Sequence, residues 1–309
     1  MAKRRRTSRT TIWLIVVVLI SLVLVAVLLN QTRLGDVNPA EPTPDQLYSP
    51  SGSDDFFVTF FDEVENGDAI LLCNTGECMM IDAGHNGDGT KLLPELKDRS
   101  VTSLKYLVGT HPHEDHIGGL DEIIKSDVKV GEVMLPEKTS TTKTYISLLE
   151  AIRDAKLEIN VPKVGEVYHL GTDTFTILGP VSKAEDMNNN SIVILYHHID
   201  GSGNTTSFLF TGDAEAKEES EIISTGLLED VSVYKVGHHG SRTSTSDAFL
   251  KIIQPEFAVI MCGEDNSYGH PHSETIEKLN GLGTLVLRTD IDGTVTMIVQ
   301  EGKIDYVTE

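Results

Sequence analysis

The chain has 309 residues, of which 47 are acidic and 25 are basic, so its formal net charge at neutral pH is −22. An acidic excess of this size repels polyphosphates over most of a protein surface, which excludes a nucleic-acid-binding module with a broad basic face. We therefore expect no stable nucleic-acid-binding surface, and we attribute the charge to solubility.

The N-terminus combines a basic cluster with a long apolar run. Five basic residues and no acidic residue lie in positions 1–10, and Ser21 alone interrupts the apolar positions from Ile12 to Leu29. A run of this length, at about 1.5 Å per residue, covers most of a hydrocarbon core of roughly 30 Å. Positions 11–30 therefore predict a transmembrane helix, with the basic segment in the cytoplasm and the rest of the chain outside the cell membrane.

The rest of the chain divides into a linker and one domain. Residues 31–55 contain four prolines, which is typical of a tether. Residues 56–309 have the length of one large domain. A signal peptide cleaved after Ala26 is the alternative to a retained membrane anchor.

Short apolar runs alternate with amphipathic stretches from residue 56 onward, which predicts a mixed α/β domain. In the first half we expect strands at 56–61, 69–73, 78–81, 104–108 and 130–135, and helices at 91–97, 117–125 and 145–155. In the second half we expect strands at 166–170, 174–178, 191–198, 206–210, 231–236, 257–261, 284–288 and 293–299, and helices at 215–224, 247–253 and 273–279. Strands grouped with helices twice over predict two sheets packed face to face, with helices outside.

Two of the three cysteines flank a turn. Cys73 and Cys78 enclose Asn-Thr-Gly-Glu in a predicted hairpin, whereas Cys262 stands alone. Cross-strand neighbours are close enough for a disulfide, but two small buried apolar residues would explain the pair equally well.

The loop at residues 110–119, Thr-His-Pro-His-Glu-Asp-His-Ile-Gly-Gly, concentrates metal-binding side chains between a predicted strand and a predicted helix. His111 and His113 lie two residues apart, so both imidazoles can point toward one metal ion. Asp115 and His116 follow directly and can serve a second ion. The loop therefore predicts two halves of a metal site.

Later loops offer further ligands, and each follows a predicted strand. Asp213 in Thr-Gly-Asp is able to bridge two metal ions, although a helix N-cap is the alternative role. His238 and His239 lie between glycines, where one imidazole can bind metal and the other can contact substrate or orient a ligand. Strand ends meet at one edge of a sheet, so these loops can converge.

Seven blocks in this order resemble the metallo-β-lactamase superfamily, and within it the hydrolase-like domain of the DNA-uptake competence protein ComEC. The blocks are residues 61–70, 81–84, 110–119, 211–213, 235–241, 266–272 and 288–295. The resemblance implies an α/β fold of the αββα four-layer sandwich type, with a metal cleft along one edge of the paired sheets.

The resemblance also implies a ligand set for two divalent metal ions, zinc or manganese. The first ion would be bound by His111 and His113, the second by Asp115, His116 and His238, and both by Asp213, with His239 as the fallback for His238. Many members of the superfamily have a further first-site histidine, but this chain reads Met-Asn-Asn-Asn-Ser at 187–191. Water, substrate or the amide oxygen of Asn189 or Asn190 would fill that position, which suits manganese.

The expected chemistry is hydrolysis by a water that two cations activate. Asp115, His239 and His272 are the expected catalytic residues, and Asn189, Asn190, Ser241, His270 and His272 the expected substrate contacts, while Ser273 is a candidate helix cap. The resemblance favours a phosphodiester substrate, with DNA as one candidate, so we expect a membrane-anchored phosphodiesterase or nuclease. One alternative is an envelope-polymer esterase, such as a phosphorylcholine esterase. Another is a catalytically silent, metal-stabilised surface receptor or scaffold. A β-lactamase is the weakest alternative, because the first-site histidine is missing.

Overall fold

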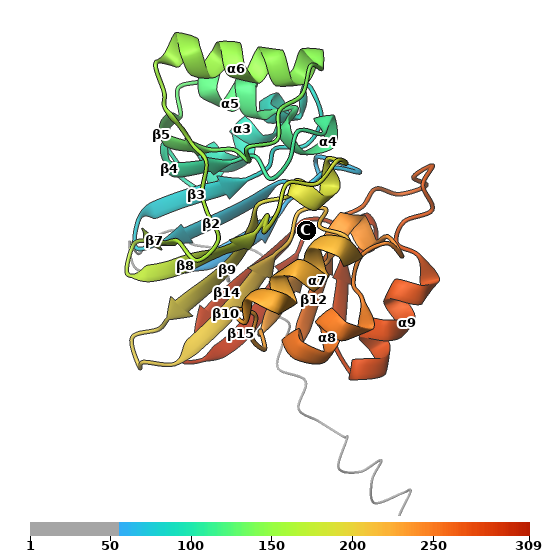
Figure 1. Cartoon of the computed structure of the whole chain (residues 1–309). Coiled ribbons are helices and arrows are strands. Elements are labelled where there is room, and N and C mark those ends of the chain that lie inside the picture. Colours follow the sequence, from blue (N-terminus) through green and yellow to red (C-terminus); the bar gives the residue numbers. More distant parts are fainter. Residues whose placement is uncertain (1–55) are drawn as a thin grey trace, which may run out of the picture. The chain divides into compact units, whose positions relative to one another are not determined.

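The computed structural model describes residues 56–309, which fold as two β-sheets covered by helices (Figure 1). The predicted basic segment at 1–10, transmembrane helix at 11–30 and linker at 31–55 lie outside the described residues. Within residues 56–309, no helix combines the length and the apolar character needed to cross a bilayer.

The first sheet has eight strands in the order β15-β14-β1-β2-β3-β4-β5-β6. Their bounds are β1 (Phe57–Phe60), β2 (Ile70–Asn74), β3 (Glu77–Ile81), β4 (Ser103–Val108), β5 (Lys129–Met134), β6 (Ile159–Asn160), β14 (Val295–Gln300) and β15 (Lys303–Thr308). Strands β3 to β6 are mutually parallel. Their carboxyl ends therefore lie at one edge of the sheet.

The second sheet has seven strands in the order β13-β12-β11-β10-β9-β8-β7. Their bounds are β7 (Val167–Leu170), β8 (Asp173–Gly179), β9 (Val193–Ile199), β10 (Thr205–Phe210), β11 (Val233–Lys235), β12 (Phe257–Ile260) and β13 (Leu285–Arg288). Strands β10 to β13 run parallel.

Alternating side chains of the second sheet divide between two hydrophobic clusters. On β9, Ile194 and Tyr196 belong to the core between the sheets, whereas Val193 and Leu195 belong to the cluster on the opposite face. This is the period-two pattern of a strand buried on both faces. Phe60 on β1 and Phe210 on β10 close the core, with ring centroids 6.3 Å apart.

Helices cover the outer faces of both sheets (Figure 1). The described helices are α3 (Asp88–Asp98), α4 (Glu114–Ile117), α5 (Leu120–Lys125), α6 (Lys143–Ala155), α7 (Ala216–Thr225), α8 (Asp247–Ile253), α9 (Ser273–Leu282) and α10 (Thr289–Asp292), with short 3₁₀ helices η1 (Asn188–Asn190) and η2 (Gly237–Gly240). Ile222, Phe249 and Leu279 of α7, α8 and α9 pack on the outer face of the second sheet. The predicted sandwich of two sheets between helices is confirmed.

Some elements differ from the sequence prediction. The single helix expected at 117–125 is two short helices, α4 and α5. Gly118 and Gly119 separate them and pack backbone to backbone against the segment 83–89, where a Cβ atom would clash. The expected strand pattern ended at residue 299, but β15 adds an antiparallel edge strand beyond it. Its residues are mostly exposed.

Cys73 and Cys78 form a disulfide across the β2–β3 hairpin, where the two residues are direct cross-strand partners. The structure thus supports the first of the two alternatives left open for this pair. Cys262 is a free, buried cysteine.

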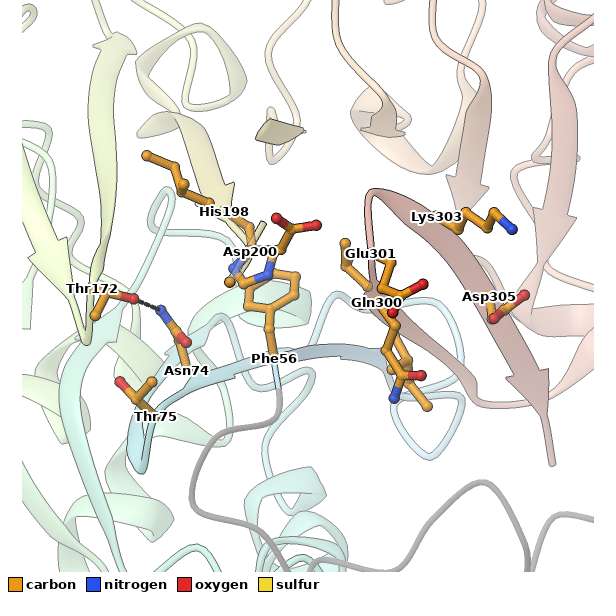
Figure 2. Close-up of a pocket in the computed structure, with 14 residues that line it drawn as sticks. Phe56, Asn74, Thr75, Thr172, His198, Asp200, Gln300, Glu301, Lys303 and Asp305 are labelled. Atoms are coloured by element: carbon orange, nitrogen blue, oxygen red, sulfur yellow. Dashed lines mark hydrogen bonds between the residues drawn. The ribbon is translucent and has the colours of Figure 1, made fainter. Parts of the chain in front are cut away.

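A cavity of about 760 Å³ lies beside the β2–β3 hairpin tip and the β14–β15 turn (Figure 2). Phe56 stacks on His198 at its wall, with ring centroids 4.0 Å apart, and Asn74 Nδ2 donates to Thr172 Oγ1. None of the candidate metal-binding groups within residues 56–309 lines this cavity. The candidate metal centre lies near the opposite ends of β2 and β9.

Candidate metal centre

The histidine loop leaves the carboxyl end of β4 and enters helix α4. His113 occupies the N-cap position with extended backbone angles, and Asp115 and His116 lie in the first turn. Asp82, at the end of the neighbouring strand β3, accepts hydrogen bonds from the backbone N–H and the hydroxyl of Thr110, each at 2.7 Å. The adjoining strand ends thus position the loop.

Asp82 also orients His116. Its Oδ2 lies 2.7 Å from His116 Nδ1, so the imidazole presents Nε2 to the centre of the site. A carboxylate behind a histidine in this way holds the ring and increases its basicity as a ligand.

Four side chains form the first candidate metal-binding group: Asp115, His116, Asp213 and His239, whose ligand atoms all lie within 4.8 Å of one another. His116 Nε2, His239 Nε2 and Asp213 Oδ1 are buried and have no hydrogen-bond partner. Buried polar atoms of this kind are costly unless something binds them. Three such atoms converging from α4, η2 and the end of β10 fit a divalent cation.

A second group shares Asp213 and contains His111 and His113. His111 Nε2 lies 3.9 Å from Asp213 Oδ2 and 2.9 Å from His113 Nδ1. Ser191 supports this group, because its hydroxyl lies 3.4 Å from His111 Nδ1 and accepts the backbone N–H of Asp213. Asp213 is not a helix cap, since Glu215 occupies the N-cap position of α7.

The adjacent histidines of η2 point in different directions. Both have positive φ, 48° for His238 and 52° for His239, a conformation that L-residues rarely adopt outside functional or strained sites. His239 Nδ1 lies 3.0 Å from the carbonyl oxygen of Met261, which leaves Nε2 to face Asp115 at 3.4 Å and Asp213 at 3.5 Å.

His238 takes a different place, which revises the predicted assignment. Its Nδ1 lies 3.1 Å from Glu215 Oε1, and its Nε2 lies 3.7 Å from Asp213 Oδ2, the oxygen that faces His111. His238 is therefore not in the group with Asp115 and His116. The fallback residue, His239, takes that place.

The carboxylates create a strong negative potential in the centre. Burial alone would lower the pKa of His239, but Asp213, Asp68 and Asp115 outweigh it and raise this pKa to about 10. His116 shows the same balance, and its pKa lies well above the ordinary value. Burial alone would raise the pKa of Asp115, yet His116 and His239 hold it below its usual range. Such a site attracts protons and, equally, cations.

Two buried residues of the centre were missed by the sequence analysis. Asp68 and Lys235 form an ion pair, and Asp68 Oδ1 lies 3.4 Å from His239 Nδ1. The signal was available: Asp68 lies two residues before the fully buried strand β2, and Lys235 is a lone charge in the apolar run 231–236. Asp68 and Lys235 both lie within the seven sequence blocks that carry the family resemblance, but the sequence analysis assigned neither of them a role.

The predicted roles of Asn189 and Asn190 are not supported, because their amides brace the loop before β9. Asn189 Oδ1 accepts the backbone N–H groups of Glu215 and Glu218, at the start of α7. The Asn190 side chain exchanges hydrogen bonds with the backbone of Ala184. Both amide oxygens are thus occupied away from the metal groups.

Only some of the expected substrate contacts line a cavity at the metal groups. A cavity of about 260 Å³ at the metal groups is lined by Asn66, His113, Glu114, Asp115, Asp213, His238, His239, Tyr268 and His270. Ser241 is not among these residues and is buried, with its hydroxyl 2.9 Å from that of Thr243. His272 is the N-cap residue of α9, in place of Ser273, and its Nδ1 accepts the backbone N–H of Arg242. Of these three residues, only His270 lines the cavity.

Burial and the neighbouring imidazoles of His238 and His239 lower the pKa of His270 to about 4. His270 is therefore a neutral imidazole at physiological pH. It can donate or accept a hydrogen bond at the wall of the cavity.

Two sheets between helices, with paired His/Asp groups at the strand ends, define an α/β sandwich with a candidate metal centre. Residues 62–264 match the family model described as metallo-beta-lactamase superfamily, and the chain belongs to this superfamily. The resemblance found in the sequence is confirmed.

The chain is also similar to longer competence proteins. It is 32% identical over 204 residues to ComE operon protein 3 of Bacillus subtilis (strain 168), which is 66% of this chain and 26% of that protein. It is 32% identical over 241 residues to Recombination protein 2 of Haemophilus influenzae, 75% of this chain and 28% of that protein, and 26% identical over 254 residues to Competence protein ComA of Neisseria gonorrhoeae, 80% of this chain and 33% of that protein. The chain thus spans about a quarter to a third of these relatives.

Among solved structures, CmlA, a diiron beta-hydroxylase from Streptomyces venezuelae, is similar with a TM-score of 0.51 and 14% identity. The match covers 81% of this chain and 55% of CmlA. At this identity the similarity shows the shared fold alone.

Proposed function

We propose that the chain is a metal-dependent phosphodiester hydrolase. The observation that carries this proposal is the pair of His/Asp groups that share Asp213, one with His111 and His113 and the other with Asp115, His116 and His239. Imidazole nitrogens and carboxylate oxygens bind zinc and manganese. Two divalent ions bound there would lower the pKa of water and neutralise charge that develops at phosphorus.

The chain's own residues have separate tasks in this proposal. Asp115 stays ionised and, with Asp213, keeps the centre anionic enough to retain cations. Asp82 holds the ring of His116, the carbonyl oxygen of Met261 holds that of His239, and Asp68 lies beside His239 Nδ1. His270 has a ring N–H to donate to a phosphoryl oxygen. No serine or cysteine nucleophile is required.

The names of the relatives, a recombination protein and competence proteins, support DNA as the phosphodiester over an envelope polymer. The acidic chain offers little electrostatic attraction to a long polyanion. We therefore propose that binding depends on the metal groups and the small cavity beside them.

Location at the cell membrane is part of the proposal and depends on the apolar sequence between Ile12 and Leu29. Membrane fractionation and protease accessibility of the full chain test it. A catalytic domain that is digested in intact spheroplasts would support an extracytoplasmic site. A protected domain, or a chain in the soluble fraction, would contradict it.

The function is tested with the full chain purified in detergent. Its metal content is measured by inductively coupled plasma spectrometry, and hydrolysis of bis-p-nitrophenyl phosphate is followed with and without added manganese or zinc. Bound metal with metal-dependent hydrolysis supports the proposal. Bound metal without hydrolysis would favour the catalytically silent, metal-stabilised receptor or scaffold, and selective release of phosphorylcholine from an envelope polymer would favour the esterase. Absence of both metal and hydrolysis would contradict the proposed enzyme.

A further inference from the structure

The loop between β12 and α9 presents an exposed aromatic side chain at the metal cavity. Tyr268 lines this cavity and is 72% exposed, more than any other large hydrophobic side chain of residues 56–309. Burying it would be favourable. A ligand that covers this ring beside the candidate reaction centre would therefore be stabilised by the contact.

The loop that carries Tyr268 is braced by hydrogen bonds. Asn266 Nδ2 donates to the carbonyl oxygens of Gly263 and His270, and Asn266 Oδ1 accepts the backbone N–H of His270 at 2.9 Å. Gly263 N–H in turn donates to Asn66 Oδ1. These hydrogen bonds brace the loop on both sides of Tyr268, at Asn266 and His270.

Tyr268 is the outermost ring of a stack that leads into the metal centre. Its ring lies 5.7 Å from that of His270 at an interplanar angle of 21°, and the ring of His270 lies 6.3 Å from that of His239 at 22°. His239 Nε2 is among the atoms of the first metal group. Two ring contacts, Tyr268 with His270 and His270 with His239, therefore connect the exposed face of Tyr268 with the place where a scissile phosphodiester would bind.

A planar, weakly polar ligand fits this arrangement best. Another flat ring, such as a nucleobase, can stack on the exposed end of these nearly parallel rings. A quaternary ammonium group is instead enclosed by several aromatic faces. Within residues 56–309, Tyr268 is the one phenylalanine, tyrosine or tryptophan that lines the cavity. A base inside a duplex has no free face, so the base must be unpaired.

We propose that Tyr268 is a stacking platform for the base of a nucleotide adjoining the scissile bond, so that the substrate class is single-stranded nucleic acid. This inference rests on the proposed phosphodiester hydrolysis. Tyr268 contributes specificity for a base next to the phosphate, while the metal groups carry the chemistry.

The test compares two labelled substrates that share one backbone: a hexamer of thymidines, and the same hexamer with every base replaced by hydrogen. The full chain, loaded with its preferred metal, should cleave the thymidine hexamer with a kcat/KM roughly tenfold higher, equivalent to about 1.4 kcal/mol of base stacking. Tyr268→Ala should bring this ratio close to one, and Tyr268→Phe should retain it. Tyr306→Ala is the matched control, a partly exposed tyrosine on β15 outside the metal cavity, and should keep the wild-type ratio.

Equal kcat/KM for the two hexamers in the wild-type chain, or an unchanged ratio in Tyr268→Ala, would overturn the platform while leaving the hydrolase intact, provided bis-p-nitrophenyl phosphate is still cleaved. Loss of phosphorylcholine release in Tyr268→Ala, with no preference for thymidine, would assign the ring to a cationic ligand and overturn the proposal too. No hydrolysis of any phosphodiester would overturn the proposed function, and the platform with it.

Discussion

Lys235 and Asp68 form an ion pair that solvent does not reach, with side chains 0% and 1% exposed. Burial alone would raise the pKa of Asp68, but Lys235 and His239 lower it below its ordinary value. The pair links β11 to the segment before β2, and Asp68 Oδ1 lies 3.4 Å from His239 Nδ1. The ion pair thus lies directly beside a candidate metal ligand.

Replacing Lys235 by methionine should destabilise the fold by about 3–5 kcal/mol, because Asp68 would remain buried without its partner. The double variant Lys235→Met/Asp68→Leu should recover much of this loss in denaturant unfolding. It should nevertheless bind metal about 10–100-fold more weakly than the wild type, because His239 loses the neighbouring carboxylate that increases the basicity of its ring. Wild-type metal affinity in the double variant would show that the pair is purely structural.

The two adjacent histidines should differ in metal binding. His239→Ala should remove the ion bound with Asp115 and His116, whereas His238→Ala should retain it, because His238 Nδ1 faces Glu215 instead. Metal content after gel filtration, measured for both variants, checks this. Equal loss in both, or loss only in His238→Ala, would contradict the geometry of η2.

Metal binding should release protons and strengthen as pH rises. The pKa of His239 is raised to about 10, so in the metal-free chain at pH 7 this residue carries a proton that a metal ion must displace, and the pKa of His116 is raised in the same direction. The apparent affinity should increase up to tenfold per pH unit for each proton released, at pH values below 10. Calorimetric titration in two buffers of different ionisation enthalpy measures the proton count. Zero released protons would contradict the expected charge state.

Glu218 on α7 should make stability depend on pH. Its side chain is buried and forms no salt bridge within residues 56–309, and burial raises its pKa well above the ordinary value of 4.5. A raised carboxyl pKa means that stability is highest below pH 4.5 and falls as pH rises toward the folded-state pKa.

Glu218→Gln should therefore be more stable than the wild type, by a margin that grows with pH by up to about 1.4 kcal/mol per unit. Chemical denaturation at pH 5 and pH 8 measures the margin. The exposed Glu277→Gln on α9 is the matched control and should show no such growth. A margin that shrinks with pH would reverse the assigned sign.

The sequence predicted the parts of the fold with a strong local pattern. The alternation on β9 follows the period of a strand buried on both faces, and the histidine spacing at 111–116 defined the metal loop without any structure. The exposed edge strand β15 is not buried on both faces and lacks such a pattern. The placement of His239, and not His238, beside Asp115 and His116 arises from the left-handed backbone conformations of both histidines, which the residue types do not predict. Asp68 and Lys235 were missed because their pairing joins residues 167 positions apart.

The most direct test of the metal-hydrolase proposal combines metal content and turnover in Asp213→Asn, because Asp213 belongs to both groups. The wild-type chain should bind two divalent ions and hydrolyse bis-p-nitrophenyl phosphate. Asp213→Asn should keep its circular dichroism spectrum and lose roughly 100-fold or more of this activity. The exposed Asp305→Asn on β15 should behave as the wild type. A wild-type chain without bound metal, or full turnover in Asp213→Asn, would contradict a shared metal centre.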